Sequence, residues 1–209
     1  MRGLAFLMGL SFTLELAAAE ILFNEDFSKV PVGRVPGKIL VLGGDFSVQE
    51  DGKERFLELP GKPIELFAAM FGPATKAAVA VEARILGKRR GRRAFPAFGL
   101  GLNGVSGFRV LVSPAKGKME LFRGEAKLRD VPFRWERDDW THVRLEMNAV
   151  ADGWRVEARA WSQGGKAPAK PNIVWLEKQK PLAARATLWG APYAGTPIRF
   201  DDLRVLKLD

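Results

Sequence analysis

The sequence of 209 residues contains no cysteine, a single histidine (His142) and a single tyrosine (Tyr193). The absence of cysteine excludes disulfides, thiol catalysis and zinc sites built on cysteine. One histidine and one tyrosine leave few groups for general acid–base chemistry near neutral pH. Enzymes that need several such groups are therefore disfavoured.

Long apolar runs are also missing after residue 19, so no membrane-spanning helix is expected in the rest of the chain. At the start, Arg2 precedes an apolar run over residues 4–14, and Ala17 and Ala19 complete a small-residue cleavage pattern. This pattern predicts a signal peptide over residues 1–19, with a buried N-terminal helix as the alternative. The mature chain, residues 20–209, is then one exported domain. An exported protein without cysteine fits a bacterial periplasm or cell surface, or secretion from such a cell.

Basic residues outnumber acidic ones, 33 to 24, which gives a net charge of +9. Such a balance favours acidic glycans or lipid headgroups as partners, or serves only solubility. The densest basic run is "GKRRGRRA" (residues 87–94), between two apparent strands, where a hairpin tip would present five cations. No aromatic residue interleaves the run and export is predicted, so nucleic acid is not expected. The candidate polyanion-binding residues are Lys88, Arg89, Arg90, Arg92 and Arg93.

Strand patterns recur throughout the mature chain at short intervals, with Gly or Pro between them. In "AAVAVEARIL", for example, Val79, Val81, Ala83 and Ile85 share one face of a period-2 strand. About a dozen such strands, without repeats or a long linker, predict an all-β antiparallel sandwich or barrel.

The segments "WTHVRLEMN" and "GWRVEARAW" form the strongest predicted hairpin, because Asp152–Gly153 lies between them. With those two residues as the turn, Glu146 lies opposite Arg159 in an ion pair. Arg144 then lies opposite Trp161 in a cation–π contact. A longer turn would keep the same faces and shift the partners by two residues.

Trp161 lies on the polar face of this hairpin, among charged residues. It is either a platform on which a sugar ring stacks or a lid that packs under Arg144 without a ligand. The candidate glycan-binding residues are Trp161, His142, Arg144 and Arg159. Trp175, Trp189 and Tyr193 flank loops and could line one rim of a concave face, although large aromatic residues more often fill sandwich cores.

The segment "DDWTHVRLEMNAVADGWRVEARAW" resembles the central hairpin of concanavalin A-like, laminin-G-like jelly rolls. "FNEDFS" and "IRFDDLRV" resemble the paired terminal strands of such sandwiches. The resemblance implies a two-sheet jelly roll with a concave face that often binds glycans. It leads us to expect a non-catalytic carbohydrate-binding or cell-surface recognition domain.

The resembling family also contains glucanases, which carry an acidic strand motif of the form E-x-D-x-x-E. That motif is absent here. If the protein were nevertheless a divergent glycoside hydrolase or polysaccharide lyase, its catalytic residues would be His142, Glu146 and Glu157. A structural envelope-associated protein without a small ligand is the third possibility.

The final strand changes parity. Ile198 and Phe200 share one face, whereas Leu203 shares the other, so a bulge near Asp201–Asp202 is expected. In the resembling modules, acidic residues at this place and in the first strand hold a structural calcium ion, with a solvated acidic pair as the alternative here. The candidate calcium ligands are Asp201, Asp202, Glu25 and Asp26.

Overall fold

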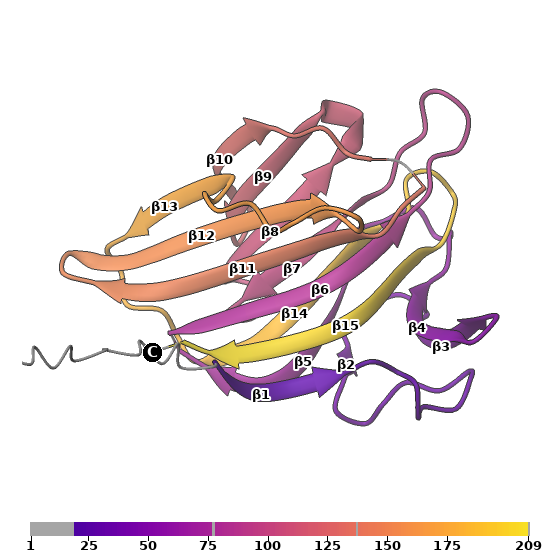
Figure 1. Ribbon diagram of the computed structural model, residues 1–209, viewed down its shortest axis with the longest axis horizontal. Coiled ribbons are helices and arrows are strands. Elements are labelled where there is room, and N and C mark those ends of the chain that lie inside the picture. The colour runs from indigo at the N-terminus through magenta and orange to yellow at the C-terminus, as the bar shows by residue number, and fades with distance from the viewer. Residues whose placement is uncertain (1–18, 77, 137, 209) are drawn as a thin grey trace, which may run out of the picture.

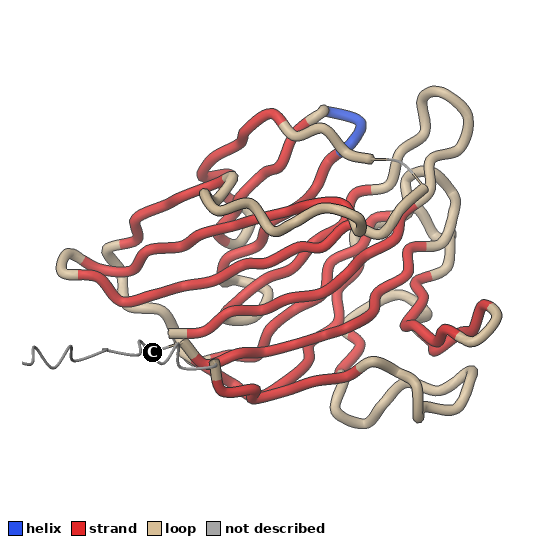
Figure 2. Tube along the Cα trace, in the orientation of Figure 1, coloured by secondary structure: helices blue, strands red, loops and turns tan. Residues whose placement is uncertain are grey.

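The computed structural model describes residues 19–76, 78–136 and 138–208, and within them two antiparallel sheets face each other as a sandwich (Figure 1). Figure 2 shows that strands make up most of the trace, with the short 3-10 turn η1 (Pro114–Lys116) between two of them. The predicted all-β sandwich is therefore confirmed. The predicted signal peptide lies outside the described residues, except for Ala19.

We call the first sheet sheet I. Its strands follow the order β13-β12-β11-β6-β15-β4-β3, and β1 also pairs with β15. Their bounds are β1 (Glu20–Glu25), β3 (Ser47–Asp51), β4 (Glu54–Leu59), β6 (Val79–Gly87), β11 (Thr141–Val150), β12 (Gly153–Ser162), β13 (Ile173–Glu177) and β15 (Ile198–Lys207). This sheet joins the beginning of the described chain to its end (Figure 1).

Sheet II follows the order β10-β9-β8-β7-β14-β5-β2. Its strands are β2 (Leu40–Val41), β5 (Phe67–Thr75), β7 (Ala97–Leu102), β8 (Phe108–Ser113), β9 (Lys118–Arg123), β10 (Ala126–Pro132) and β14 (Ala184–Ala191).

The core lies between the sheets and is built from alternate residues of both. Val79, Val81, Ala83 and Ile85 of β6 all lie in it, at most 3% exposed, as their spacing predicted. Each fully buried Val, Leu, Ile or Phe contributes about 1.5–3 kcal/mol relative to exposure. The residues between them, such as Glu82, point to the outer face of sheet I. The strand period thus decides which side chains can meet a ligand there.

The β11–β12 hairpin has the predicted faces but a different register. Val150 pairs with Gly153, so the turn is Ala151–Asp152 and every partner is displaced by two residues from the prediction. Gly153 has φ of +135°, and a Cβ there would lie 2.3 Å from the Glu177 carbonyl oxygen. The glycine is needed for close approach to the end of β13 and is not one of the two turn residues.

The predicted bulge in β15 is confirmed. The register with β6 shifts between Asp201 and Arg204, and Asp202 has φ of +51°. The bulge allows Phe200 and Leu203 both to be fully buried despite their opposite parity.

The basic segment differs from its prediction. Because β6 belongs to sheet I and β7 to sheet II, residues 88–96 pass from one sheet to the other and do not form the tip of a hairpin between these strands. The segment closes on itself through a bridge between Arg90 and Ala94, and its Arg90 amide donates to the Ala94 carbonyl at 2.9 Å.

Candidate functional site

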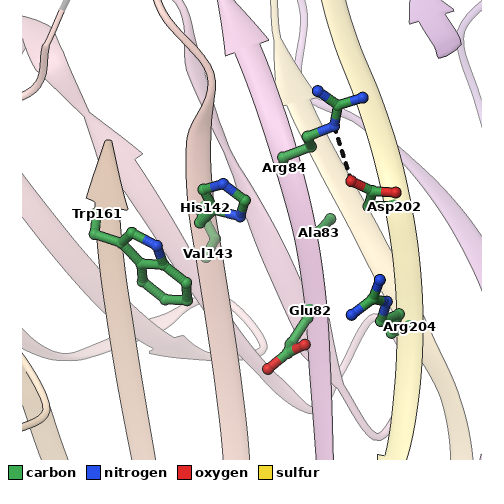
Figure 3. Close-up of a pocket in the computed structure, with 8 residues that line it drawn as sticks. All are labelled: Glu82, Ala83, Arg84, His142, Val143, Trp161, Asp202 and Arg204. Carbon is green, nitrogen blue, oxygen red and sulfur yellow. Dashed lines mark ion pairs between the residues drawn. The ribbon is translucent and has the colours of Figure 1, made fainter. Parts of the chain in front are cut away.

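A shallow hollow of about 110 Å³ lies on the outer face of sheet I, where β12, β11, β6 and β15 run side by side (Figure 3). Its lining residues come from all four strands and include the bulge of β15. They are Glu82, Ala83, Arg84, His142, Val143, Trp161, Asp202 and Arg204.

Trp161 forms one wall of this hollow. It lies opposite His142, and the two rings are stacked with centroids 5.2 Å apart and planes 7° from parallel. The His142 Nε2 atom lies 2.8 Å from the Gln163 Oε1 atom, which holds the imidazole in place. The predicted cation–π contact with Arg144 is wrong, because the register places Arg144 opposite Arg159.

The indole of Trp161 also borders a second, more open hollow of about 380 Å³, whose lining includes Arg144, Arg159, Ala167 and Pro168. Trp161 is half-buried. The side chain is therefore a partition between two hollows, supported by His142, and does not serve as a lid under an arginine.

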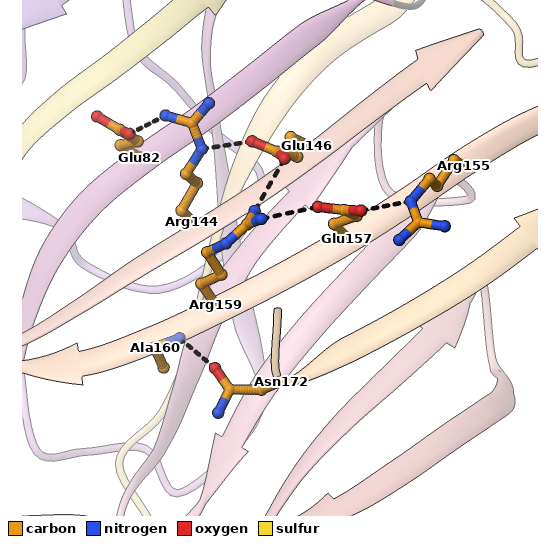
Figure 4. A network of polar contacts seen from close by, with 8 residues as sticks. All are labelled: Glu82, Arg144, Glu146, Arg155, Glu157, Arg159, Ala160 and Asn172. Atoms are coloured by element: carbon orange, nitrogen blue, oxygen red, sulfur yellow. Dashed lines mark hydrogen bonds and ion pairs between the residues drawn. The ribbon is translucent and has the colours of Figure 1, made fainter. Parts of the chain in front are cut away.

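Arginine and glutamate side chains alternate across β6, β11 and β12 in a continuous network (Figure 4). The predicted ion pair of Glu146 with Arg159 is present, with Oε1 and Nη1 2.8 Å apart, although the two residues are diagonal neighbours. Arg159 Nη2 also lies 2.8 Å from Glu157 Oε2. The full sequence of partners is Glu82, Arg144, Glu146, Arg159, Glu157 and Arg155.

This network includes two of the predicted ligand-binding residues. Arg144 uses Nη1 and Nε for Glu82 and Glu146, and Arg159 uses Nη1 and Nη2 for two glutamates. Both guanidinium groups therefore serve to hold the strands of sheet I together. Both residues nevertheless line the more open hollow beside Trp161, so their assignment as sugar-binding donors stays a prediction.

The residues predicted for an enzymatic alternative do not form an acid–base pair. Glu146 and Glu157 are each 8% exposed and held by arginines. Burial alone would raise the pKa of Glu146, but hydrogen bonds and charge from Arg144 and Arg159 outweigh it and lower the pKa below its ordinary value. A carboxylate kept ionised in this way is unsuited to act as a general acid.

The predicted calcium ligands of β15 face a cation of the protein itself. Arg84 Nε lies 2.9 Å from Asp202 Oδ2, and Arg84 Nη2 contacts both Asp201 and Glu54. Burial raises the pKa of Asp201 to about 7, an effect that the charge of Arg84 only partly offsets. The guanidinium group thus takes the place between the two aspartates that a metal would need.

The other two predicted calcium ligands are engaged in local turns. Glu25 Oε1 accepts the Phe27 amide at 2.9 Å, and Asp26 Oδ1 accepts the Ser28 hydroxyl at 2.7 Å and lies 3.0 Å from the Ser28 amide. The Ser28 hydrogen bonds lower the pKa of Asp26. No cluster of three or more potential metal ligands occurs among the described residues. The proposed set does not fit calcium, which needs six or more oxygens.

Arg204 is the cation of the hollow that sequence analysis missed. It is exposed, donates from Nε to Asn24 Oδ1 at 3.3 Å, and has no ion pair within the described parts of the chain. The parity change at the bulge was the available signal, because it turns Arg204 outward next to Glu82, its partner in register. Figure 3 shows both side chains at the same end of the hollow.

The comparisons with known proteins show the fold but no family. No protein-family model matches the sequence, and no curated protein matches it. The carbohydrate-binding module CBM66 from Bacillus subtilis aligns with a TM-score of 0.57 at 10% identity, covering 81% of this chain and 95% of that one. A glycosyl hydrolase family protein from Mycobacterium fortuitum aligns with a TM-score of 0.55 at 17% identity, over 89% and 99% of the two chains.

A third similar structure is the exoplasmic/lumenal domain of VIP36 in its Ca²⁺/Man2-bound form. It has a TM-score of 0.57 and 9% identity, with 82% of this chain and 88% of that one covered. Lectin-like and glycosyl hydrolase β-sandwiches therefore share this fold. The described residues include no helix with the length and apolar character needed to cross a bilayer.

Proposed function

We propose that the protein is an exported, non-catalytic carbohydrate-binding domain of the concanavalin A-like type, and that Trp161 contacts the glycan. The observation that supports this most strongly is the half-buried indole of Trp161 beside hydrogen-bonding side chains on an otherwise polar sheet face. Sugars present an apolar C–H face and a polar edge, and this arrangement complements both.

In this proposal the sugar ring lies against the indole, in one of the two hollows that border it. His142, stacked on Trp161, restricts the ring to one orientation before the ligand arrives. The polar groups of the 110 Å³ hollow that would meet sugar hydroxyls are Glu82, Asp202 and Arg204. In the more open hollow, Arg144 and Arg159 would meet the sugar hydroxyls from within their ion-pair network.

Export is proposed on the predicted leader over residues 1–19, with a bacterial periplasm, cell surface or medium as the destination. The structural similarity to a domain described as exoplasmic/lumenal is compatible with this. Calcium is not required by the proposal, because Arg84 neutralises the aspartates of the bulge.

The test is the affinity of the wild type and Trp161→Ala for a panel of neutral polysaccharides, measured by isothermal titration calorimetry. Loss of ring stacking should weaken binding about tenfold or more, which corresponds to about 1.4 kcal/mol. Trp161→Phe, which keeps an aromatic face, should bind with intermediate affinity. Leu176→Ala, on the exposed side of β13, is the matched control and should bind like the wild type.

The proposal would be rejected if no polymer of the panel bound, or if Trp161→Ala bound as tightly as the wild type. Thermal melting of each variant separates lost binding from lost folding.

A further inference from the structure

The outer face of sheet II carries an apolar cluster that is separate from the core. Ala68, Leu111 and Trp189 are buried in it, and Leu66 and Phe122 pack against them. The outer face of an antiparallel sheet is ordinarily solvated and polar. Because the three buried residues are at most 7% exposed, the partly buried Leu66 and Phe122 are the members of the cluster that can meet a ligand.

A hollow of about 140 Å³ opens beside this cluster. Its lining residues include Leu111 and Phe122 of the sheet and the loop residues Phe95 and Tyr193. Tyr193 is 50% exposed, so its ring is accessible from outside. The hollow thus presents aromatic walls to solvent, as sugar-binding surfaces do.

Arg109 packs against Phe122, one of the aromatic residues that line the hollow. Its Cζ atom is 4.9 Å from the centre of the Phe122 ring and 4.3 Å from that of Trp189, between the two. The side chain is 4% exposed, its Nε and Nη1 atoms have no hydrogen-bond partner, and the nearest carboxylate, of Glu125, is 4.0 Å from Nη1. A positive charge that is poorly compensated within the protein therefore lies next to an aromatic residue of the hollow.

The carboxylate in the hollow is already satisfied. Glu120 Oε2 accepts the Ser113 hydroxyl at 2.7 Å and the Lys116 ammonium at 3.0 Å. Burial would raise the pKa of Glu120, but these hydrogen bonds and the nearby lysine charges lower it. The ionised Glu120 is balanced by Lys116, so its negative charge does not offset that of Arg109 or of the basic loop.

The basic loop, residues 88–93, lies close in sequence and in space to residues that line this hollow. Phe95 is the second residue after the loop, and the guanidinium group of Arg90 lies 3.3 Å from where a Cβ on Gly195 would stand, two residues after Tyr193. None of the five cations of the loop forms an ion pair with another described residue. Their charge is therefore available to a ligand in the hollow.

We infer that this face binds an acidic polysaccharide. One sugar ring enters the hollow against Tyr193 and Phe122, and carboxylates of neighbouring units meet the basic loop. The aromatic walls favour a ring over a flexible acidic chain, and the unpaired cations favour an acidic glycan over a neutral one. This second site lies on the opposite sheet from Trp161, and it does not depend on the function proposed for that residue.

The test uses polygalacturonate as the probe and measures its affinity at two salt concentrations. Two matched polymers separate the contribution of the sugar rings from that of the charge. Fully methyl-esterified polygalacturonate keeps the rings without the charge, and polyglutamate keeps the charge without the rings. We expect polygalacturonate to bind at least fivefold more tightly than either, and to bind more weakly as salt rises.

Tyr193→Ala and the double variant Arg90→Gln/Arg92→Gln should each weaken polygalacturonate binding about fivefold or more. Lys166→Gln/Lys170→Gln, which removes two exposed lysines from another loop, is the charge-matched control and should bind like the wild type. Trp161→Ala should also retain this affinity, which distinguishes the second site from the first.

Equal affinity for polygalacturonate and polyglutamate would overturn the inference, since charge attraction alone would then suffice. Unchanged binding by Tyr193→Ala, or no binding of polygalacturonate at low salt, would overturn it as well.

Discussion

The arginines on the outer face of sheet I and those around the hollow of sheet II have opposite environments. Arg144 and Arg159 each form two ion pairs with glutamates, one on the same strand and one on a neighbouring strand. Arg109 has two nitrogens without a hydrogen-bond partner, and the basic loop has no ion pair among the described residues. The difference comes from the alternation of Arg and Glu along and across β6, β11 and β12, which gives each arginine glutamate neighbours at the next outward position of its own strand and on an adjacent strand. A high arginine content thus indicates binding only where the register leaves the charge unpaired.

The largest expected effect on stability comes from removing one arginine of the ion-pair network on sheet I. Arg144→Met should leave Glu82 without its cation and the buried Glu146 with Arg159 alone, at a cost of up to about 5 kcal/mol in the free energy of unfolding. Denaturant unfolding followed by circular dichroism measures it. A loss below about 1 kcal/mol would mean that the network contributes little to the fold.

The next effect concerns the buried aspartate at the bulge. The pKa of Asp201 is about 7 in the folded state, above its value of about 4 in an unfolded chain, so the folded state holds its proton more tightly. The associated stability is fully present below about pH 4 and is lost as the pH rises through about 7, by up to roughly 4 kcal/mol.

Unfolding midpoints measured across this pH range give the size of the effect. Asp201→Asn, which cannot ionise, should flatten the dependence. A wild-type profile that is retained in this variant would show that another group is responsible.

A smaller effect on stability is expected at Gly101 in β7 of sheet II, next to Trp189. A Cβ on Gly101 would lie 2.3 Å from the Thr187 hydroxyl oxygen and 3.1 Å from the Trp189 Nε1 atom. Gly101→Ala should therefore displace the indole that stacks on Arg109 and cost roughly 1–3 kcal/mol. Thermal melting and tryptophan emission test this against Gly164→Ala, a position with no atom within 4 Å of the new Cβ. Identical melting of the two variants would contradict the close packing.

The smallest effect on stability is expected in the basic loop, whose cations have no ion pair with a described residue. Arg92→Gln in the basic loop should change the free energy of unfolding by no more than about 0.5 kcal/mol, because the residue is exposed and has no ion pair with a described residue. The same denaturant experiment that tests Arg144→Met provides the direct contrast. A cost comparable to that of Arg144→Met would remove the distinction between the two regions.

Local pattern was sufficient for the fold and for the faces of its strands. The alternation in β6 predicted its buried side chains, and the parity change in β15 predicted its bulge. The register of β11 and β12 was displaced by two residues, because the glycine of the Asp152–Gly153 pair is required by β13 instead of by the turn. The sequence of the β11–β12 turn alone does not reveal that Gly153 must make room for the end of β13.

The sites were less predictable because they depend on long-range partners. Arg84 lies far from Asp201 in sequence, yet it occupies the place assigned to calcium. The hollow of sheet II combines Tyr193, for which a rim position was predicted, with Phe122 and the buried Glu120, for which no role was. Only the strand order of the sheet brings these residues together.

The single histidine of the chain offers the most direct test of the central claim, that carbohydrate binds at Trp161 on sheet I. Because His142 stacks on that indole, its imidazole resonance in a ¹H–¹³C NMR spectrum is an unambiguous reporter of the site. A neutral polysaccharide that the protein binds should shift this resonance saturably, with the same affinity as calorimetry gives. A resonance that stays unchanged while the polymer is bound would contradict the claim.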